Sequence, residues 1–163
     1  MSNNIKYYFI SILTAISLQM FSTSYAHEID LDEISIKHPI IPFFNSKMKT
    51  AAGYLTIVNK KPETDELIMV KTDFAKARIH MSKIDKNGIA SMEHVNKVII
   101  PGSSSVVFEQ GSLHIMFTKL KEPLEEYNDQ KVTLVFKNLG DIEVEFQVEQ
   151  ATKKMNMKNN HDH

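Results

Sequence analysis

The chain has 163 residues, a formal net charge of −1 with histidine neutral, 9 methionines, 7 histidines and no cysteine. A charge so close to zero leaves no basic stripe to neutralise phosphates, so we expect no nucleic-acid partner. The lack of cysteine excludes disulfides, thiolate catalysis, zinc sites built on cysteine and lipid attachment through a cysteine.

Residues 1–26 have the pattern of a secretory signal peptide. Lys6 supplies a positive charge, and residues 7–21 are mostly apolar but too short and too interrupted by polar side chains to span a bilayer comfortably. Ser24 and Ala26 place small residues where a signal peptidase reads the chain. We therefore predict cleavage after Ala26, export, and no stable membrane span after signal removal. An uncleaved membrane anchor is the alternative.

Residues 27–49 have no clear pattern. Pro39 and Pro42 interrupt regular structure, so we predict a short extended N-terminal segment with His38 on its surface. After cleavage, His27 would carry a free amine beside an imidazole, and the two could chelate Cu(II) or Ni(II). A frayed terminus without bound metal is the alternative.

Residues 50–150 predict a single β domain. Short runs rich in β-branched and aromatic residues alternate with turn signals, and residues 142–148 alternate apolar and polar side chains, as expected for a strand buried on one face. No segment keeps a helical apolar period over three turns. We therefore predict an all-β, cupredoxin-like or Ig-like β-sandwich. The expected strands are 53–58, 67–70, 77–84, 95–100, 106–108, 113–117, 132–136 and 142–148.

Residues 151–163 change composition to a polar tail, which we predict to be disordered. The tail contains Met155 and Met157 followed by His161 and His163. Thioethers suit Cu(I) and imidazoles suit Cu(II), so the tail could be an accessory copper ligand set. The alternative is a solvated terminus that happens to contain these residue types.

His114 and Met116 lie two positions apart in an apolar run that reads as a strand. An extended backbone points both side chains to the same face. An imidazole beside a thioether is a neutral, soft donor pair, which suits Cu(I) better than Mg²⁺, Ca²⁺ or Mn²⁺. The pair alone is a weak signal, because methionine on a strand usually packs in the core.

A predicted hairpin could bring further soft ligands to this pair. His80 precedes a turn that contains Gly88, and Met92 and His94 follow it. A two-residue loop of type I′ would put Met92 on the face opposite to His80. A three-residue loop over 86–88, with Gly88 left-handed, would place His80 opposite His94 and put Met92 on their face. Both turns fit these residues.

The spacing of these residues resembles a known signature. The chain reproduces the H(M)X10MX21HXM motif of the PCuAC family of periplasmic copper chaperones. The matching residues are His80 and Met81, then Met92 after ten intervening residues, and then His114, Ile115 and Met116 after a further twenty-one. The resemblance covers residues 51–148. The surroundings are also similar at 52–55 and Asn59, at 65–67, at 101–102, at Gly111 and at 120–124. The chain departs from the family at Ser112-Leu113, where many members have Gly-Tyr before the histidine.

The resemblance implies a cupredoxin-like sandwich that binds one Cu(I) near its surface and a hairpin with the three-residue loop. The residues at the ligand positions are His80, Met92, His114 and Met116. Met81 matches an optional position and is expected to be auxiliary. His94 is a further neighbour that could tune or relay the metal, and the alternative is a surface histidine near a strand end with no role in binding.

The function implied is a periplasmic Cu(I) chaperone that delivers copper to the copper-site subunit of cytochrome oxidase or to its assembly factors. We expect no enzymatic activity, because the sequence offers no second functional group or substrate pocket for catalysis. One alternative is a copper-sequestering tolerance protein that buffers periplasmic copper with the tail as extra capacity. Another is an exported sandwich that binds proteins and whose motif is vestigial.

Overall fold

The structure, a computed structural model, describes residues 28–151. The predicted signal peptide and nearly all of the predicted tail lie outside these residues. The described residues form β-strands joined by turns and contain no helix, so none of them could cross a membrane as a helix. The all-β, cupredoxin-like fold predicted from the sequence is confirmed.

Most strands belong to one mixed sheet with the order β6-β5-β9-β3-β2-β11-β10-β4-β7, while β1 pairs with β2 and β8 with β3. Their bounds are β1 (Ile29–Asp30), β2 (Ile34–Phe43), β3 (Thr50–Asn59), β4 (Asp65–Lys71), β5 (Lys76–Ile84), β6 (Ala90–His94), β7 (Val98–Ile100), β8 (Ser104–Phe108), β9 (Leu113–Thr118), β10 (Gln130–Phe136) and β11 (Gly140–Gln150).

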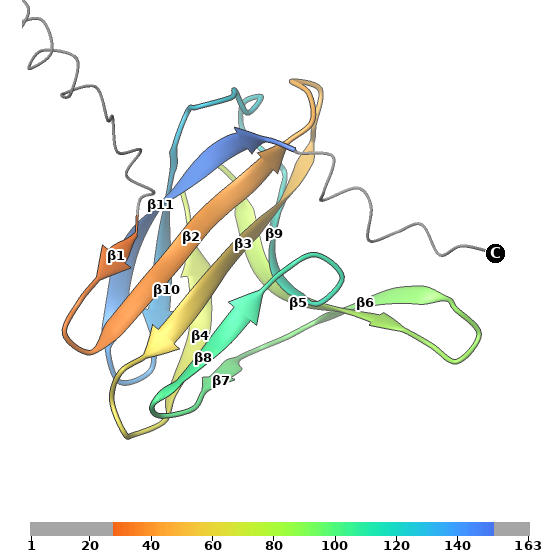
Figure 1. The fold of residues 1–163 in the computed structure, drawn as a ribbon. Helices are drawn as coiled ribbons and strands as arrows, with labels where there is room; N and C mark the ends of the chain where they lie inside the picture. The colour runs from red at the N-terminus through yellow and green to blue at the C-terminus, as the bar shows by residue number, and fades with distance from the viewer. Residues whose placement is uncertain (1–27, 152–163) are drawn as a thin grey trace, which may run out of the picture.

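The sheet is curled around one hydrophobic core (Figure 1). Alternate residues of β11 point inward, as its burial pattern shows. Phe117 of β9 lies at the centre, with its ring centroid 5.0 Å from that of Phe74 and 6.0 Å from that of Phe146. This packing fixes the inner face of β9, so its other face is free to carry chemistry.

The position of β2 differs from the prediction. We expected a short extended segment outside the β domain before residue 50, but β2 lies inside the sheet between β3 and β11, and Ile36 and Ile41 are fully buried in the core. The prolines are tolerated because the register with β3 shifts between Lys37 and Ile40, where exposed His38 has a positive φ of 50°. The β domain therefore begins well before residue 50.

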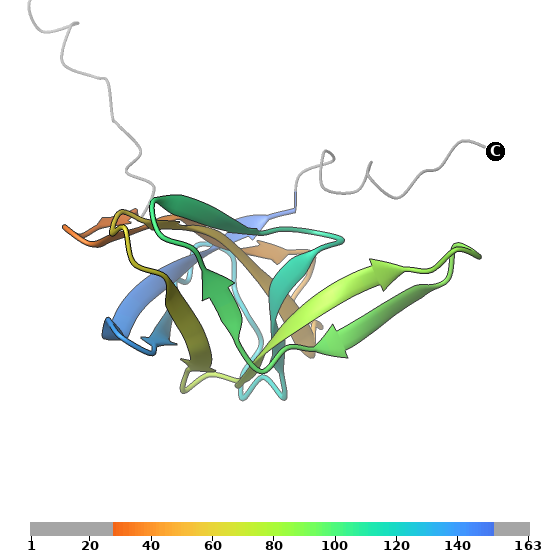
Figure 2. The ribbon, with the colours of Figure 1, turned by 90° about the horizontal axis from the view of Figure 1, so that it is seen from below.

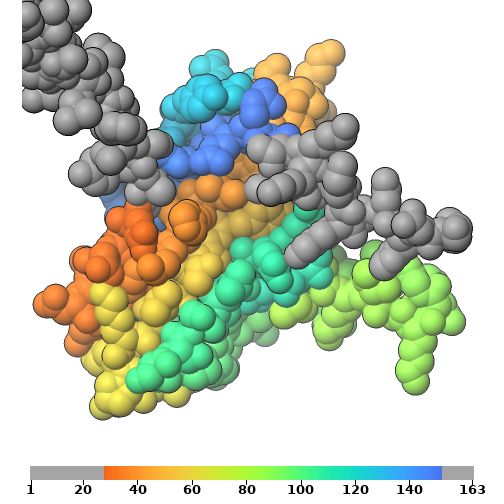
Figure 3. Space-filling view, in the orientation of Figure 1, coloured from red at the N-terminus to blue at the C-terminus, as the bar shows by residue number. Residues whose placement is uncertain are grey.

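Strands β5 and β6 form a hairpin arm, residues 80–94, that projects from the body of the protein (Figures 2 and 3). In its turn, the Gly88 N–H donates to the Asp85 carbonyl at 3.0 Å and the Asp85 N–H donates to the Ile89 carbonyl at 3.0 Å. Gly88 has a φ of +78°, which glycine adopts without strain. The three-residue loop over 86–88 is therefore confirmed, and the type I′ alternative is wrong.

Gly53 lies in β3 where this strand pairs with β9, and its surroundings leave no room for a side chain. A Cβ at this position would lie 2.7 Å from Cε2 of Phe117 and 3.0 Å from Cε1 of Phe146. We expect Gly53→Ala to lower the free energy of unfolding by about 1–3 kcal/mol, because the aromatic rings must shift. Urea denaturation of the two proteins measures the difference. Combining Gly53→Ala with Phe117→Leu should recover part of that loss, and strictly additive effects would contradict the proposed clash.

Candidate metal centre

Three histidines from three strands lie side by side on the sheet. His80 of β5 is paired with His94 of β6 on one side and with His114 of β9 on the other. We call His94, His80 and His114 the histidine row. The ring centroid of His80 lies 5.7 Å from that of His94 and 6.0 Å from that of His114. A metal–nitrogen bond of about 2 Å lets two imidazoles on one ion have centroids up to about 6 Å apart. Each neighbouring pair is thus spaced for a shared ion.

The row lies on the face of the sheet that points away from the hydrophobic core. On β9, Leu113, Ile115 and Phe117 are buried in the core, so His114 and Met116 point to the other face. His114 is nevertheless only 4% exposed, whereas His94 is exposed at the sheet edge. The row therefore runs from a buried histidine on β9 to an exposed one on β6.

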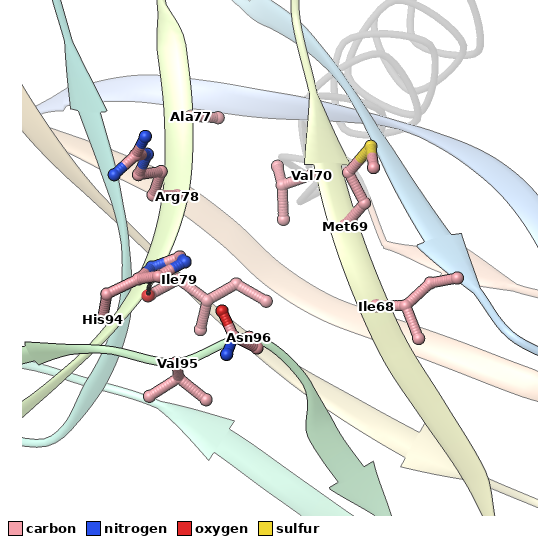
Figure 4. A pocket seen from close by; sticks show the side chains of 9 residues that line it. All are labelled: Ile68, Met69, Val70, Ala77, Arg78, Ile79, His94, Val95 and Asn96. Carbon is pink, nitrogen blue, oxygen red and sulfur yellow. Dashed lines mark hydrogen bonds between the residues drawn. The ribbon is translucent and has the colours of Figure 1, made fainter.

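Backbone carbonyls orient the two histidines that flank His80 in the row. The Nδ1–H of His114 donates to the Ser112 carbonyl at 3.0 Å, and the Nδ1–H of His94 donates to the Ile79 carbonyl at 3.1 Å (Figure 4). Because a carbonyl can only accept, Nδ1 must carry the hydrogen in both rings. The Nε2 atoms of His114 and His94 then keep their lone pairs, which is the arrangement found in histidines that bind metals.

His80, in the middle of the row, has an unusual environment. Among the described residues, its Nδ1 is the only buried side-chain nitrogen or oxygen without a hydrogen-bond partner. Burial, followed by the neighbouring His114, His94 and Arg78, lowers the pKa of His80 below its ordinary value of 6.5. A neutral imidazole with an orphaned nitrogen is ready to bind a cation, and a metal bond could compensate for the missing partner.

The two motif methionines lie at opposite sides of the row. Met116 is in register with Arg78, one pleat from His80 in one direction along β5. Met92 is in register with Ser82, one pleat from His80 in the other direction, and is 51% exposed. The structure therefore groups Met116 with the His114 end of the row and Met92 with the His94 end. Sequence spacing alone did not predict this arrangement.

Met81 does not reach the row, which corrects its expected role as an auxiliary ligand. Successive residues of a strand point to opposite faces, so Met81 points away from His80 and packs, partly buried, against the hydrophobic core. The remaining candidates lie outside the described residues: His27, Met155, Met157, His161 and His163.

The donor types limit which metal fits. Within residues 28–151, no three His, Asp or Glu side chains converge on a point that could hold a metal ion. Each neighbouring pair of the row offers two imidazoles, and Met92 or Met116, one pleat away, could add a thioether. A neutral set of two imidazoles and methionine sulfur is suited to Cu(I) and poorly suited to hard cations.

Reasoning from the sequence missed the groups that hold the row in place, since two of them are backbone carbonyls. The Ser112 carbonyl accepts hydrogen bonds from the His114 ring and from the Ser82 N–H at 3.1 Å, which joins the loop before β9 to the arm. Buried Asn59, noted only as part of a motif, donates from Nδ2 to the carbonyls of Glu63 at 2.8 Å and Ile100 at 3.2 Å. It supports the fold and lies apart from the ligands.

Comparison with known proteins gives a family and a set of similar folds. A family model described as lipoprotein LpqE-like matches residues 34–148. No curated protein sequence matches the chain. Among solved structures, the apo PCuAC domain from PmoF1 is similar with a TM-score of 0.66 and 22% identity, over 77% of this chain and 100% of that one.

Two further similar structures contain copper. The copper-bound PCuAC domain from PmoF2 has a TM-score of 0.63 and 22% identity, over 77% of this chain and 99% of that one. The Cu(I) form of DR1885 from Deinococcus radiodurans has a TM-score of 0.60 and 20% identity, over 84% of this chain and 89% of that one. At these identities the likeness is one of fold.

Proposed function

The chain belongs to the LpqE-like family, the family of the PCuAC domains, and from this premise we propose that it is a non-enzymatic copper chaperone exported to the periplasm. The observation that carries the proposal is the histidine row. It combines an orphaned imidazole nitrogen on His80 with the oriented Nε2 atoms of its two neighbours. The copper-bound PmoF2 domain and Cu(I)-DR1885, which share the fold, support copper as the cargo.

Cu(I) would be held by the four residues of the motif. On β5 and β9, His80 and His114 are cross-strand partners and Met116 lies one pleat away, so these three belong to neighbouring positions of the sheet. Met92 would reach the ion from the arm, on the other side of the row. All four donors are neutral, and none is a thiolate that oxidation outside the cytoplasm would destroy.

Delivery fits this arrangement better than catalysis. A catalytic copper centre needs an open coordination position with a substrate pocket beside it. Here the ligands lie on a sheet face next to an exposed edge strand, where another protein could exchange them. We propose, on the family resemblance, that the acceptor is the copper-site subunit of cytochrome oxidase or one of its assembly factors.

The test is an anaerobic Cu(I) titration against a chromogenic competitor. We expect one tight equivalent that survives removal of residues 152–163 and is lost in His114→Ala and in Met116→Leu. The matched control is Met69→Leu, which changes an exposed methionine on β4 that is outside the motif. Binding that disappears with the tail, while both site variants bind normally, would move the function to the C-terminus.

Copper sequestration is the second candidate function, favoured by the Met-x-Met and His-x-His pairs of the tail. A buffering protein should hold more than one ion and release it slowly, whereas a delivery protein should hold one and exchange it rapidly. Stoichiometry and the rate of transfer to a competitor separate the two.

We expect Cu(I) affinity to fall as the pH drops through the range in which imidazoles take up protons, because only neutral imidazole binds the metal. The lowered pKa of His80 delays its protonation to a lower pH than in an exposed histidine. Since the unfolded chain takes up this proton more readily, acidification below pH 6.5 also lowers the free energy of unfolding. Titrations at several pH values measure the effect, and an affinity that does not change with pH would exclude imidazole ligands.

A further inference from the structure

The nearly equal spacing within the histidine row raises the question of which pair holds the ion. His80 lies 5.7 Å from His94 and 6.0 Å from His114 between ring centroids. Within residues 28–151, however, no three such ligands converge on one point. Because His94 and His114 flank His80 from opposite sides, on β6 and on β9, an ion bound between His80 and one neighbour lies away from the other.

Each pair has its own sulfur donor. Met116 follows His114 by one pleat on β9, and Met92 precedes His94 by one pleat on β6. The two methionines lie on opposite sides of His80 along β5, so each is associated with a different neighbour. The face of the sheet thus contains two sets of two imidazoles and one thioether, and both sets are suited to Cu(I).

The two sets differ in their access to solvent and to partners. The set with His114 is the inner one, since His114 is 4% exposed. The set with His94 is the outer one, because all residues of β6 are exposed and Met92 is 51% exposed. His94 also lines an open cavity of about 400 Å³ between β4 and β5 (Figure 4).

We propose that Cu(I) has two alternative positions that share His80, and that it leaves the protein through the outer one. The inner position consists of His80, His114 and Met116 with Met92 as the fourth ligand, and the outer position consists of His80, His94 and Met92. This inference rests on the proposed function and assigns to His94 a role in release that the motif does not contain.

Movement between the positions is a ligand exchange without redox change. The bonds from copper to Nε2 of His114 and to Sδ of Met116 break while a bond to Nε2 of His94 forms. His80 and Met92 stay bound throughout. No proton has to move, because both flanking rings already carry their hydrogen on Nδ1.

The first experiment measures the rate at which the full chain, loaded anaerobically with one Cu(I), transfers the ion to an excess of chromogenic chelator. We expect His94→Ala to slow this transfer by about tenfold or more, the scale on which changes around a metal site alter affinity or activity. Removing an ordinary ligand would weaken binding and speed release, so slower transfer is specific to an exit position. The matched control, His38→Ala, removes an exposed histidine on β2 and should transfer at the wild-type rate.

The second experiment compares the residual Cu(I) affinity of His114→Ala with that of His114→Ala/His94→Ala. The tail is present in both, so their difference reports the outer position alone. We expect the second substitution to lower the residual affinity by about tenfold or more. Equal residual affinities, or wild-type transfer by His94→Ala, would overturn the two-position proposal while leaving the chaperone intact. Failure of the wild-type chain to bind Cu(I) would instead overturn the proposed function.

Discussion

Replacing His80 with alanine is expected to lower the Cu(I) affinity of the row by about a hundredfold or more, the largest effect of any single substitution in this protein. His80 is the only residue in register with both other histidines, so its loss removes an imidazole from both copper positions. His114→Ala and His94→Ala each remove only one position. Competition titrations of the three variants measure this order.

The control for His80→Ala must separate loss of a ligand from loss of structure. His80 is partly exposed and its Nδ1 has no hydrogen-bond partner, so alanine removes no protein contact through that atom. We therefore expect a urea midpoint close to that of the wild-type chain. A variant that binds copper normally would contradict the histidine row as the site, whatever its stability.

Asp65→Ala is expected to lower the free energy of unfolding by about 2–4 kcal/mol, the largest effect on stability among the polar residues. Asp65 is 5% exposed, and its carboxylate accepts three backbone hydrogen bonds. Its Oδ1 accepts from Glu66 at 2.7 Å and Asn138 at 3.0 Å, and its Oδ2 accepts from Leu139 at 3.0 Å. Alanine would leave these donors without partners where β4 meets the β10–β11 turn.

Urea denaturation measures the effect of Asp65→Ala, with Asp141→Ala as its control. Asp141 is an exposed aspartate that forms a surface ion pair with Lys71 at 3.1 Å, so its loss should cost less than about 0.5 kcal/mol. Asp65→Asn keeps an acceptor oxygen and should fall between the two. Equal midpoints for Asp65→Ala and Asp141→Ala would show that the buried carboxylate does not stabilise this corner.

Local chemistry limited the arm to two loops, since Gly88 can adopt a positive φ, and the period of two along a strand gave each loop its own assignment of faces. The residues alone left both loops open. The family resemblance favoured the three-residue loop, and the β5–β6 register confirms it. The same period explains why Met81, adjacent to His80 in the motif, packs in the core. That outcome could have been deduced from the strand alone, but the family motif suggested otherwise.

Other features depend on pairing between distant strands, which no local pattern reveals. Met92 and Met116 lie on opposite sides of His80 because of the β5–β9 register, which is set by long-range packing around Phe117. Strand β2 was missed because its prolines resemble a loop signal. The shift in the β2–β3 register at His38 lets a strand with these prolines lie inside the sheet.

The most direct test of the copper site is an NMR titration of the imidazole signals of the full chain with Cu(I) under anaerobic conditions. We predict that the signals of His80 and His114 change first and saturate at one equivalent, before those of His161 and His163. If only the two tail histidines respond at one equivalent, the histidine row is not the copper site.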